Sequence, residues 1–364
     1  MITKHRHIPF LTIKNKIYSL DKLIINPNFI IKHKIIMKTI TLSLVLFLFL
    51  VSCDKDDNTD TPDTGDQNYK TEMRNFVIGI SKYAKAKHAG FVIVPQNGIE
   101  LVTVNGEEKG TPESKYLAAI DANGQEDLFY GYDNDDEATP ASDNAYLINY
   151  LDISKDAGNK ILVTDYCSTH SKMDDANLKN AQKGFISFAA DHRELDHIPN
   201  YPNPIVSENA SDITKISDVQ NFLYLINPKS YATKSDFIQA VTATNYDLLI
   251  MDLFFKDGTA FSSSEIAQLR AKVNGGHRLV ICYMSIGEAE NYRYYWKTAW
   301  NTKKPSWMDA ENPDWPGNYK VKYWDKDWQA IIYGNDSSYL KKILDADFDG
   351  VYLDIIDAFD FFES

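Results

Sequence analysis

Eight short apolar segments, separated by helical patterns, constrain this chain more than any other feature. Each segment after residue 71 has the length of a strand and is continuously apolar. Such runs, alternating with helices, are typical of parallel strands whose sheet is covered on both faces. Strands are expected at 90–98, 118–122, 160–166, 184–190, 221–226, 246–253, 278–286 and 350–355, and helices around 73–80 and 145–157.

The number of units selects an architecture within the α/β class. Eight strand–helix units in about 290 residues match a (β/α)8 barrel. The rival, a doubly wound open sheet, normally has a Gly-rich phosphate-binding turn after its first strand, and the sequence has none. We therefore predict a single (β/α)8 TIM barrel over residues 71–364.

The segment before the barrel has the layout of a secretory signal. Lys38 follows Met37, an apolar run spans 42–51, and Ser52 precedes Cys53. A buried strand with an incidental cysteine is the alternative. The ending resembles the lipobox of bacterial lipoproteins, which implies a signal peptide at 37–52 and acylation of Cys53. Because a signal belongs at the true N-terminus, we expect residues 1–36 to derive from a misplaced start codon.

The charge distribution argues against nucleic acid as a partner. The chain has 38 basic and 51 acidic side chains, a net charge of −13. Eight of the basic residues and one acid lie in 1–52, which leaves −20 for 53–364. Residues 53–70 have the composition of a solvated tether. Their acidic start resembles the surface-export signal of Bacteroidetes lipoproteins, which implies an outer-membrane location.

Polar residues gather where the expected strands end, the face that carries the active site in barrel enzymes. They are Gln96, Asn97, Glu126, Asp165, Tyr166, Asp191, Asp252, Glu288, Asp354 and Asp357. A single acid at a strand end is usually a helix N-cap. Six such ends are harder to explain by capping, and they predict a pocket lined with carboxylates.

The residue types present favour glycoside cleavage. The sequence contains no Gly-flanked serine nucleophile and no metal motif such as H-E-x-x-H, so neither a metal nor a cofactor is expected. Three cysteines exclude a disulfide scaffold, and Cys167 and Cys282 are expected to be buried thiols. A pair of carboxyls, one protonated and one ionised, is the usual machinery for cleaving a glycosidic bond.

The tryptophans allow two interpretations. All six fall between 296 and 328, beside several tyrosines, in the excursion that follows one strand. Aromatic faces suit a sugar-binding wall. A local core beneath a long excursion fits equally well, and we expect some rings in each role.

Several longer motifs resemble a bacterial and archaeal barrel family related to glycoside hydrolase family 114, the endo-α-1,4-polygalactosaminidases. The motifs span 285–296, 312–317, 324–325 and 349–359, together with 95–98, 126–131 and 191–196. The resemblance implies a TIM barrel that hydrolyses a galactosamine-rich polysaccharide by a two-carboxylate, retaining mechanism, with no cofactor.

The order of the motifs differs from that of the family. Segments like 246–253, 285–290 and 350–359 come first in the family, whereas here they come last. We therefore predict a circularly permuted barrel, in which 200–217 joins the old ends. New ends in a surface loop break no core pairing.

Carried over residue by residue, the resemblance implies Asp354 as nucleophile and Glu126 as general acid/base, with Asp357 as the alternative nucleophile. The implied substrate-binding residues are Asp252, Glu288, Asp357, Gln96, Asn97, Asp165, Tyr166 and Trp296. The expected partners are a polysaccharide and, through Cys53, the membrane, and the protein is expected to be a monomer. A surface glycan-binding lipoprotein without catalysis is the alternative function. A deacetylase would want a metal site, which the histidine spacing does not offer.

Overall fold

The computed structural model describes residues 68–364. The predicted upstream segment, the signal peptide, Cys53 and nearly all of the tether lie outside the described residues. Helix α1 begins at Tyr69, so the last two residues of the expected tether are helical. Among the described residues, no helix is long and apolar enough to cross a membrane.

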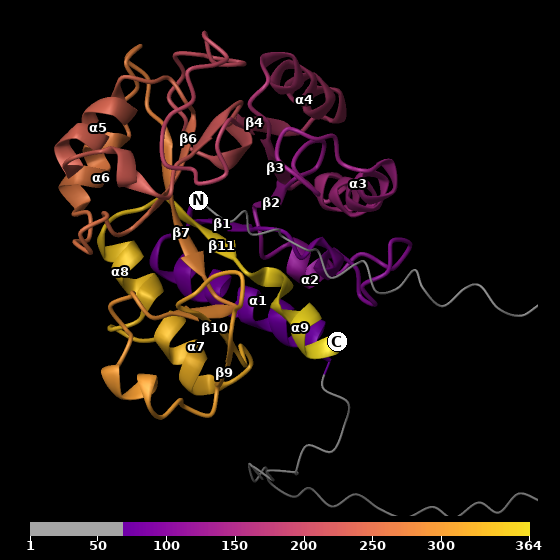
Figure 1. The fold of residues 1–364 in the computed structure, drawn as a ribbon, viewed down its shortest axis with the longest axis vertical. Helices are drawn as coiled ribbons and strands as arrows, with labels where there is room; N and C mark the ends of the chain where they lie inside the picture. The colour runs from indigo at the N-terminus through magenta and orange to yellow at the C-terminus, as the bar shows by residue number, and fades with distance from the viewer. Residues whose placement is uncertain (1–67) are drawn as a thin grey trace, which may run out of the picture. The chain divides into compact units, whose positions relative to one another are not determined.

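Two parallel sheets form the centre of the described part (Figure 1). The larger has the strand order β5-β6-β7-β11-β1, and the smaller the order β2-β3-β4. A backbone bridge between Gln96 and Gly124 joins β1 to β2. The strands are β1 (Val92–Pro95), β2 (Ala122–Glu126), β3 (Lys160–Tyr166), β4 (Ile186–Ala190), β5 (Phe222–Tyr224), β6 (Leu248–Asp252), β7 (Leu279–Ser285) and β11 (Gly350–Asp354). The predicted α/β class with parallel strands is thus confirmed.

One predicted strand was misplaced. Most of the expected strand at 118–122 is the turn that follows helix α2 (Ser114–Leu117), where the backbone N–H of Ala118 caps the helix by donating to Ser114. The true strand, β2, starts at Ala122 and contains two buried amides, Asn123 and Gln125. Strand β2 was not predicted because its sequence is not continuously apolar. Its burial depends on hydrogen bonding as well as on hydrophobicity.

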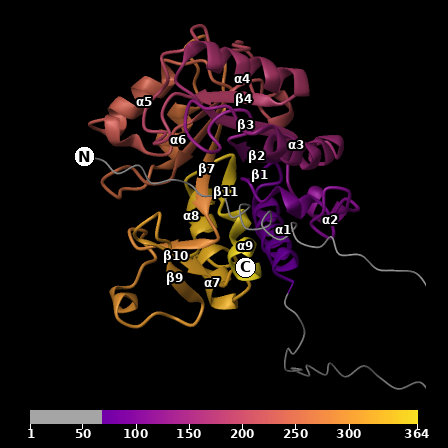
Figure 2. The ribbon, with the colours of Figure 1, turned by 45° about the vertical axis from the view of Figure 1, so that its right-hand side comes forward.

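Helices connect most of the strands. Helices α3 and α4 lie outside β2–β4, and α5 and α6 lie beside β6 (Figures 1 and 2). Their bounds are α1 (Tyr69–Lys87), α3 (Ala141–Asp156), α4 (His170–Lys183), α5 (Lys234–Thr242), α6 (Ser263–Leu269), α7 (Lys326–Ile332), α8 (Tyr339–Asp345) and α9 (Phe359–Glu363). In α1, Met73, Phe76, Val77 and Ile80 are fully buried, as their helical spacing predicts.

The segment between β7 and β11 departs from the strand–helix repeat. It contains an antiparallel sheet of order β8-β10-β9, formed by β8 (Glu288–Glu290), β9 (Met308–Glu311) and β10 (Asn318–Val321). Helices α7 and α8 follow it and return the chain to β11. This is the excursion that holds all six tryptophans.

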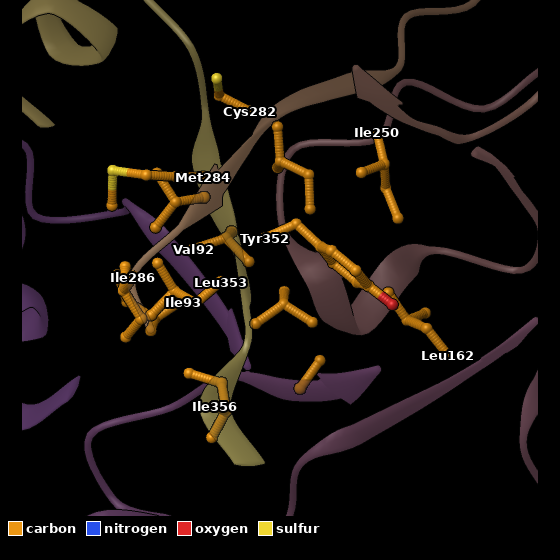
Figure 3. Packing of buried hydrophobic residues seen from close by; sticks show 14 of the residues in the cluster. Val92, Ile93, Leu162, Ile250, Cys282, Met284, Ile286, Tyr352, Leu353 and Ile356 are labelled. Carbon is orange, nitrogen blue, oxygen red and sulfur yellow. The ribbon is translucent and has the colours of Figure 1, made fainter. Parts of the chain in front are cut away.

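The main core lies between the strands and the helices that cover them. Figure 3 shows Val92, Ile93 and Leu353 packed beside Met284 and Ile286. Cys167 and Cys282 are buried free thiols, as predicted. Burial raises the pKa of Cys167 to about 12, which leaves the thiol protonated and inert at neutral pH.

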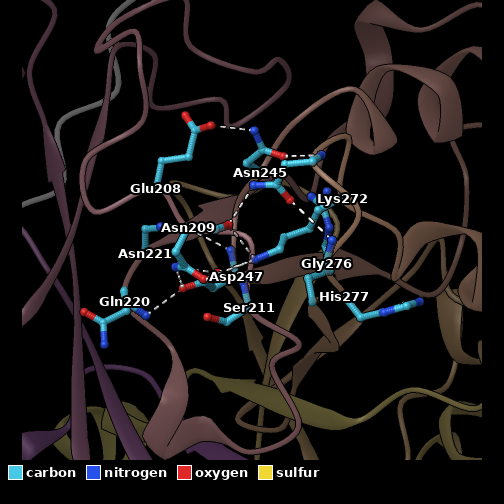
Figure 4. Close-up of polar contacts among 12 residues, drawn as sticks. Glu208, Asn209, Ser211, Gln220, Asn221, Asn245, Asp247, Lys272, Gly276 and His277 are labelled. Atoms are coloured by element: carbon cyan, nitrogen blue, oxygen red, sulfur yellow. Dashed lines mark hydrogen bonds and ion pairs between the residues drawn. The ribbon is translucent and has the colours of Figure 1, made fainter.

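The connection from β4 to β5 has no α-helix, only the short η3 turn (Ile216–Asp218). It is anchored by a buried ion pair in which Lys272 Nζ lies 2.9 Å from Asp247 Oδ1, both side chains being fully buried (Figure 4). Asp247 also accepts hydrogen bonds from Asn209 and from the backbone N–H of Gln220. These bonds fix the connection against β6, so it is an integral part of the fold.

Candidate active site

The polar cluster starts with the backbone at the end of β1. The N–H of Gln96 donates to the carbonyl of Leu353 in β11, and the N–H of Asn97 donates to the carbonyl of Gly124 in β2. Strand β1 therefore lies between the strands that end in Asp354 and Glu126. Both side chains are partly buried, and their charges interact electrostatically.

Asp354 has an unusual proton affinity. Burial, followed by the negative charge of Glu126, raises its pKa to about 8. The Tyr283 hydroxyl donates a 2.5 Å hydrogen bond to Oδ2, which favours the ionised form and partly opposes the increase. Asp354 therefore carries its proton at neutral pH in the free protein.

Glu126 has a different environment. Asn97 Nδ2 donates to Oε2 at 3.1 Å, and the Tyr166 hydroxyl donates to Oε1. The N–H of Glu126 donates in turn to Asn97 Oδ1 at 3.1 Å. Hydrogen bonds to both oxygens fix the orientation of the Glu126 carboxyl. Asn97 and Tyr166 thus orient Glu126, although the sequence analysis expected them to bind substrate.

Backbone strain is concentrated at these strand ends. Asn97, Asp127 and Ile355 have φ values of 58° and directly follow Gln96, Glu126 and Asp354. Asparagine and aspartate tolerate this left-handed conformation, whereas a β-branched isoleucine adopts it at a cost of about 1–3 kcal/mol. Gly287 makes room for it, since a Cβ there would lie 2.2 Å from the Ile355 carbonyl oxygen. Strain of this kind is typical of functional sites.

Gln96 lies beneath the two carboxyls and is 2% exposed. Tyr224 donates a 3.0 Å hydrogen bond to Gln96 Oε1, and its ring lies 5.1 Å from that of Tyr352. Tyr352 in turn needs Gly124, because a Cβ there would lie 2.1 Å from the Tyr352 hydroxyl. Gln96 therefore supports the floor of the site and does not line its surface.

Asp252 belongs to a separate charged group beside the carboxyl pair. Arg293 Nη1 lies 2.7 Å from Asp252 Oδ2, and Arg293 Nε lies 2.6 Å from Glu290 Oε2. Burial raises the pKa of Asp252, and Arg293 opposes the increase. Arg293 and Glu290 occur in the family-like motif, but pairing with Asp252 needs contact between β6 and the segment after β7. No spacing in the sequence indicates that contact.

Glu288 and Asp165 do not join the carboxyl pair. Glu288 is fully buried and accepts bonds from Asn312, Asn318 and Lys320, so it anchors the antiparallel excursion. Asp165 is also fully buried, and its oxygens accept from the N–H groups of residues 129 and 130 and from Asn180. Neighbouring residues of a strand face opposite sides, so Asp165 points away from the side that Tyr166 occupies. The prediction that Asp165 binds substrate is therefore not supported by its position.

The remaining predicted residues lie in the segments near Asp354. Asp357 follows in the η6 turn (Ile356–Ala358), where its charge helps to raise the pKa of Asp354. Trp296 is partly buried, donates from Nε1 to Asn301 at 2.9 Å and packs 5.1 Å from the Tyr319 ring. Asp357 remains a candidate for substrate contact, whereas Trp296 is engaged within the excursion.

The tryptophans divide between the two expected roles. Trp300, Trp307 and Trp328 are buried. The ring centres of Trp300 and Trp307 lie 5.2 Å apart, and those of Trp307 and Trp328 lie 5.0 Å apart. These three rings form a local core. Tyr292, Trp315 and Tyr294 are 64%, 52% and 40% exposed, so these rings of the excursion reach its surface.

Two residues that contribute to the site were not predicted from the sequence. The guanidinium carbon of Arg193 lies 3.8 Å from the centre of the Tyr166 ring, and Arg193 Nη2 lies 2.8 Å from Asp127 Oδ1. Burial raises the pKa of Asp127 to about 7 although Arg193 opposes this. Tyr283 was also missed, although the strict alternation of β7 places it on the same side as Ser285. An alternation count along each strand would have found it.

Comparison with known proteins shows that part of the chain is similar to one protein family. Residues 208–363 match glycoside-hydrolase family GH114. The predicted resemblance is confirmed over that part of the chain. The matched GH114 region contains Asp252, Glu288, Trp296, Asp354 and Asp357, whereas Glu126 and its supporting residues precede it.

Uncharacterized proteins from three organisms are also similar. One from Methanocaldococcus jannaschii is 39% identical over 158 residues, which is 43% of this chain and 42% of that protein. One from Deinococcus radiodurans is 42% identical over 122 residues, 34% and 37% of the respective chains. One from Thermotoga maritima is 37% identical over 121 residues, 33% and 36%. The matches thus span about two-fifths of the length of these curated relatives.

Proposed function

We propose that the protein is a glycoside hydrolase that uses Asp354 and Glu126 as its pair of catalytic carboxyls. The observation that carries the proposal is a pair of acids on the two strands that flank β1. The two acids have different environments, and Asp354 has a pKa of about 8. Such divergence between neighbouring acids is the usual mark of acid/base and nucleophile roles. The GH114 match supports glycosidase chemistry in general.

The proposed reaction is retaining and proceeds in two steps. The Asp354 carboxylate attacks the anomeric carbon while the glycosidic C–O bond breaks, and Glu126 gives its proton to the leaving oxygen. Water then attacks the same carbon, Glu126 takes the water proton, and the bond to Asp354 breaks. The first step needs the proton of the pair on Glu126 and Asp354 ionised, whereas burial and the charge of Glu126 favour the proton on Asp354 in the free protein.

A cationic substrate resolves this requirement. We propose an α-1,4-linked, partly deacetylated galactosamine polymer, whose C2 ammonium lies one carbon from the reacting centre. A positive charge beside Asp354 lowers its pKa and favours the nucleophilic form. The net charge of −20 over residues 53–364 also attracts such a polymer.

The decisive experiment measures hydrolysis of this polymer by wild type, Asp354→Asn and Glu126→Gln. Each variant is expected to lose about 10²-fold or more in kcat/KM, the usual contribution of a positioned acid or base. Asp257→Asn, which changes an exposed acid in the loop after β6, is the control and retains activity. If both site variants match wild type, the catalytic assignment is wrong.

Binding without cleavage is the alternative function. If the protein only binds surface glycans, polymer binding should be saturable, should release no new reducing ends, and should be equal in wild type and Asp354→Asn.

Proton NMR of the first product of hydrolysis distinguishes retention from inversion. Azide added to an Asp354→Gly variant is expected to give a glycosyl azide of inverted configuration, which identifies the nucleophile.

We further propose that the eight parallel strands close into one barrel whose order is circularly permuted. Closure requires β4 to meet β5, and the rings of Phe188 and Phe222 on these strands lie 5.5 Å apart. The helix-free β4–β5 connection would be the joint between the old ends. At the new ends, Lys70 pairs with Glu363 and Tyr69 stacks on Phe362 at 5.5 Å.

The permutation can be tested by restoring the family order. A gene encoding 208–364, a short Gly/Ser linker and 68–207 is expected to give a protein with the same activity, because the joined ends are in contact. The control is a permuted protein with the same linker between residues 364 and 68 but with its new ends placed within β6. This control protein should not fold. Failure of the reordered protein to fold would contradict the proposal.

The location is proposed from the sequence alone. Acylation of Cys53 would anchor the protein in the outer membrane, through the tether that precedes α1. Metabolic labelling with a fatty acid is expected to label wild type and to miss Cys53→Ala. Equal labelling of the two would exclude lipidation at Cys53.

A further inference from the structure

A group of histidine and aspartate side chains lies in the turn that directly follows β4. His192 Nδ1 lies 3.1 Å from Asp196 Oδ1, and His197 Nδ1 lies 2.8 Å from the same oxygen. One ligand atom from each of the three residues falls within 4.8 Å of the others. The histidine spacing offered no metal motif in the sequence, because a turn and not a helix brings these residues together.

The turn is held in place by its own contacts. The N–H of Leu195 donates to the carbonyl of His192, and Leu195 is buried with a φ of 49°. Asn227, beyond β5, donates to the carbonyls of Glu194 and Leu195. The three donor residues are thus presented on a fixed backbone, which reduces the entropy lost when a ligand orders them.

We propose that His192, Asp196 and His197 bind a divalent transition-metal ion of the Zn²⁺ class. Two imidazoles and a carboxylate are a common ligand set for such ions. Ligands about 2.0–2.1 Å from a tetrahedral ion stand roughly 3.4 Å apart, so the two pairs around Asp196 need to open by only a few tenths of an ångström. The fourth position is left for water or substrate.

The strongest indication comes from the residue behind the group. The other ring nitrogen of His197, Nε2, lies 3.1 Å from Asp191 Oδ1. A metal-bound histidine typically donates its second N–H to a carboxylate, which fixes the ring and its tautomer. Asp191 supplies that bond, so His197 Nδ1 is directed toward the proposed ion.

The site also has a route to the carboxyl pair. Arg193, between the proposed ligands, lies over Tyr166, and Tyr166 donates to Glu126. A bound ion would therefore fix the turn that positions Arg193 over Tyr166. Binding of the ion can be measured without hydrolysis, since none of its ligands contacts Asp354 or Glu126 through a hydrogen bond described in this structure.

The test is metal binding by the full chain purified without a polyhistidine tag. After chelator treatment, calorimetric titration with Zn²⁺ is expected to give one ion per chain, and Co²⁺ is expected to give a visible absorption band. His197→Ala should raise Kd by more than 100-fold, and Asp191→Asn by about 10–100-fold. His192→Ala, at a half-exposed side chain, gives a ligand deletion with little risk to folding.

The matched control is His277→Ala, which removes a histidine 2.8 Å from Asp212 that has no third ligand residue nearby within 68–364. It should leave Zn²⁺ binding unchanged. The proposal is overturned if wild type binds no Zn²⁺, or if His192→Ala and His197→Ala bind it as tightly as wild type. Because binding is measured without substrate, its outcome is separate from that of the hydrolysis assay.

Discussion

Replacing Tyr283 by Phe probes the electrostatics of the carboxyl pair most directly. The Tyr283 hydroxyl donates a 2.5 Å hydrogen bond to Asp354 Oδ2 and stabilises the ionised form. A hydrogen bond to a charged group contributes about 1.5–3 kcal/mol, and one pKa unit corresponds to about 1.4 kcal/mol. Tyr283→Phe should therefore raise the pKa of Asp354 from about 8 to between about 9 and 10.

Two measurements follow this change. Carbon NMR of labelled aspartate carboxyls gives the pKa of Asp354 without any substrate. The proposed reaction needs one proton on the pair, so kcat/KM should fall as pH rises through the pKa of the free enzyme. In Tyr283→Phe this fall moves upward by one to two pH units, and kcat/KM at pH 7 is about 10–100-fold below wild type, because the variant holds the proton more strongly on Asp354.

The control is Tyr146→Phe, which removes a hydroxyl that donates 2.7 Å to Glu100, away from the pair. It should leave the pKa of Asp354 unchanged. An unchanged or lowered pKa in Tyr283→Phe would refute the electrostatic account. A kcat/KM at pH 7 that Tyr283→Phe leaves equal to that of wild type would show that Asp354 is the acid and Glu126 the nucleophile.

Three further changes test other parts of the structure. Between the unfolded pKa of about 3.9 and the folded value of about 8, the folded chain keeps a proton on Asp354 that the unfolded chain loses, so wild-type stability falls as pH rises. Asp354→Asn should therefore gain at least about 1 kcal/mol over wild type between pH 5 and 8 in urea unfolding, and a constant difference would contradict this. Lys272→Ala leaves a buried carboxylate unpaired and should cost about 3–5 kcal/mol, far more than Lys341→Ala, which removes a surface ion pair with Asp345. Gly124→Ala should cost about 1–3 kcal/mol in thermal unfolding, and less in a Tyr352→Phe background, because the new Cβ meets that hydroxyl first.

Periodicity alone located most of the secondary structure, because apolar runs and helical spacing are local properties of the chain. It found α1 and seven of the eight parallel strands. It failed at β2, where Asn123 and Gln125 are buried and the preceding apolar residues form the turn after α2. Hydrogen bonds formed with distant residues decide such a strand, and no local window contains them.

The sequence by itself determined that Asp354 ends β11, and the family resemblance selected Glu126, which the structure places at the end of β2. Only the tertiary structure decided what each acid does there. It set Tyr283 against Asp354 and Asn97 against Glu126, paired Asp252 with Arg293, and turned Asp165 to the opposite side of its strand. The physical reason is that a side chain's charge state and orientation depend on burial and on partners far away in the sequence, and these exist only after the chain has folded.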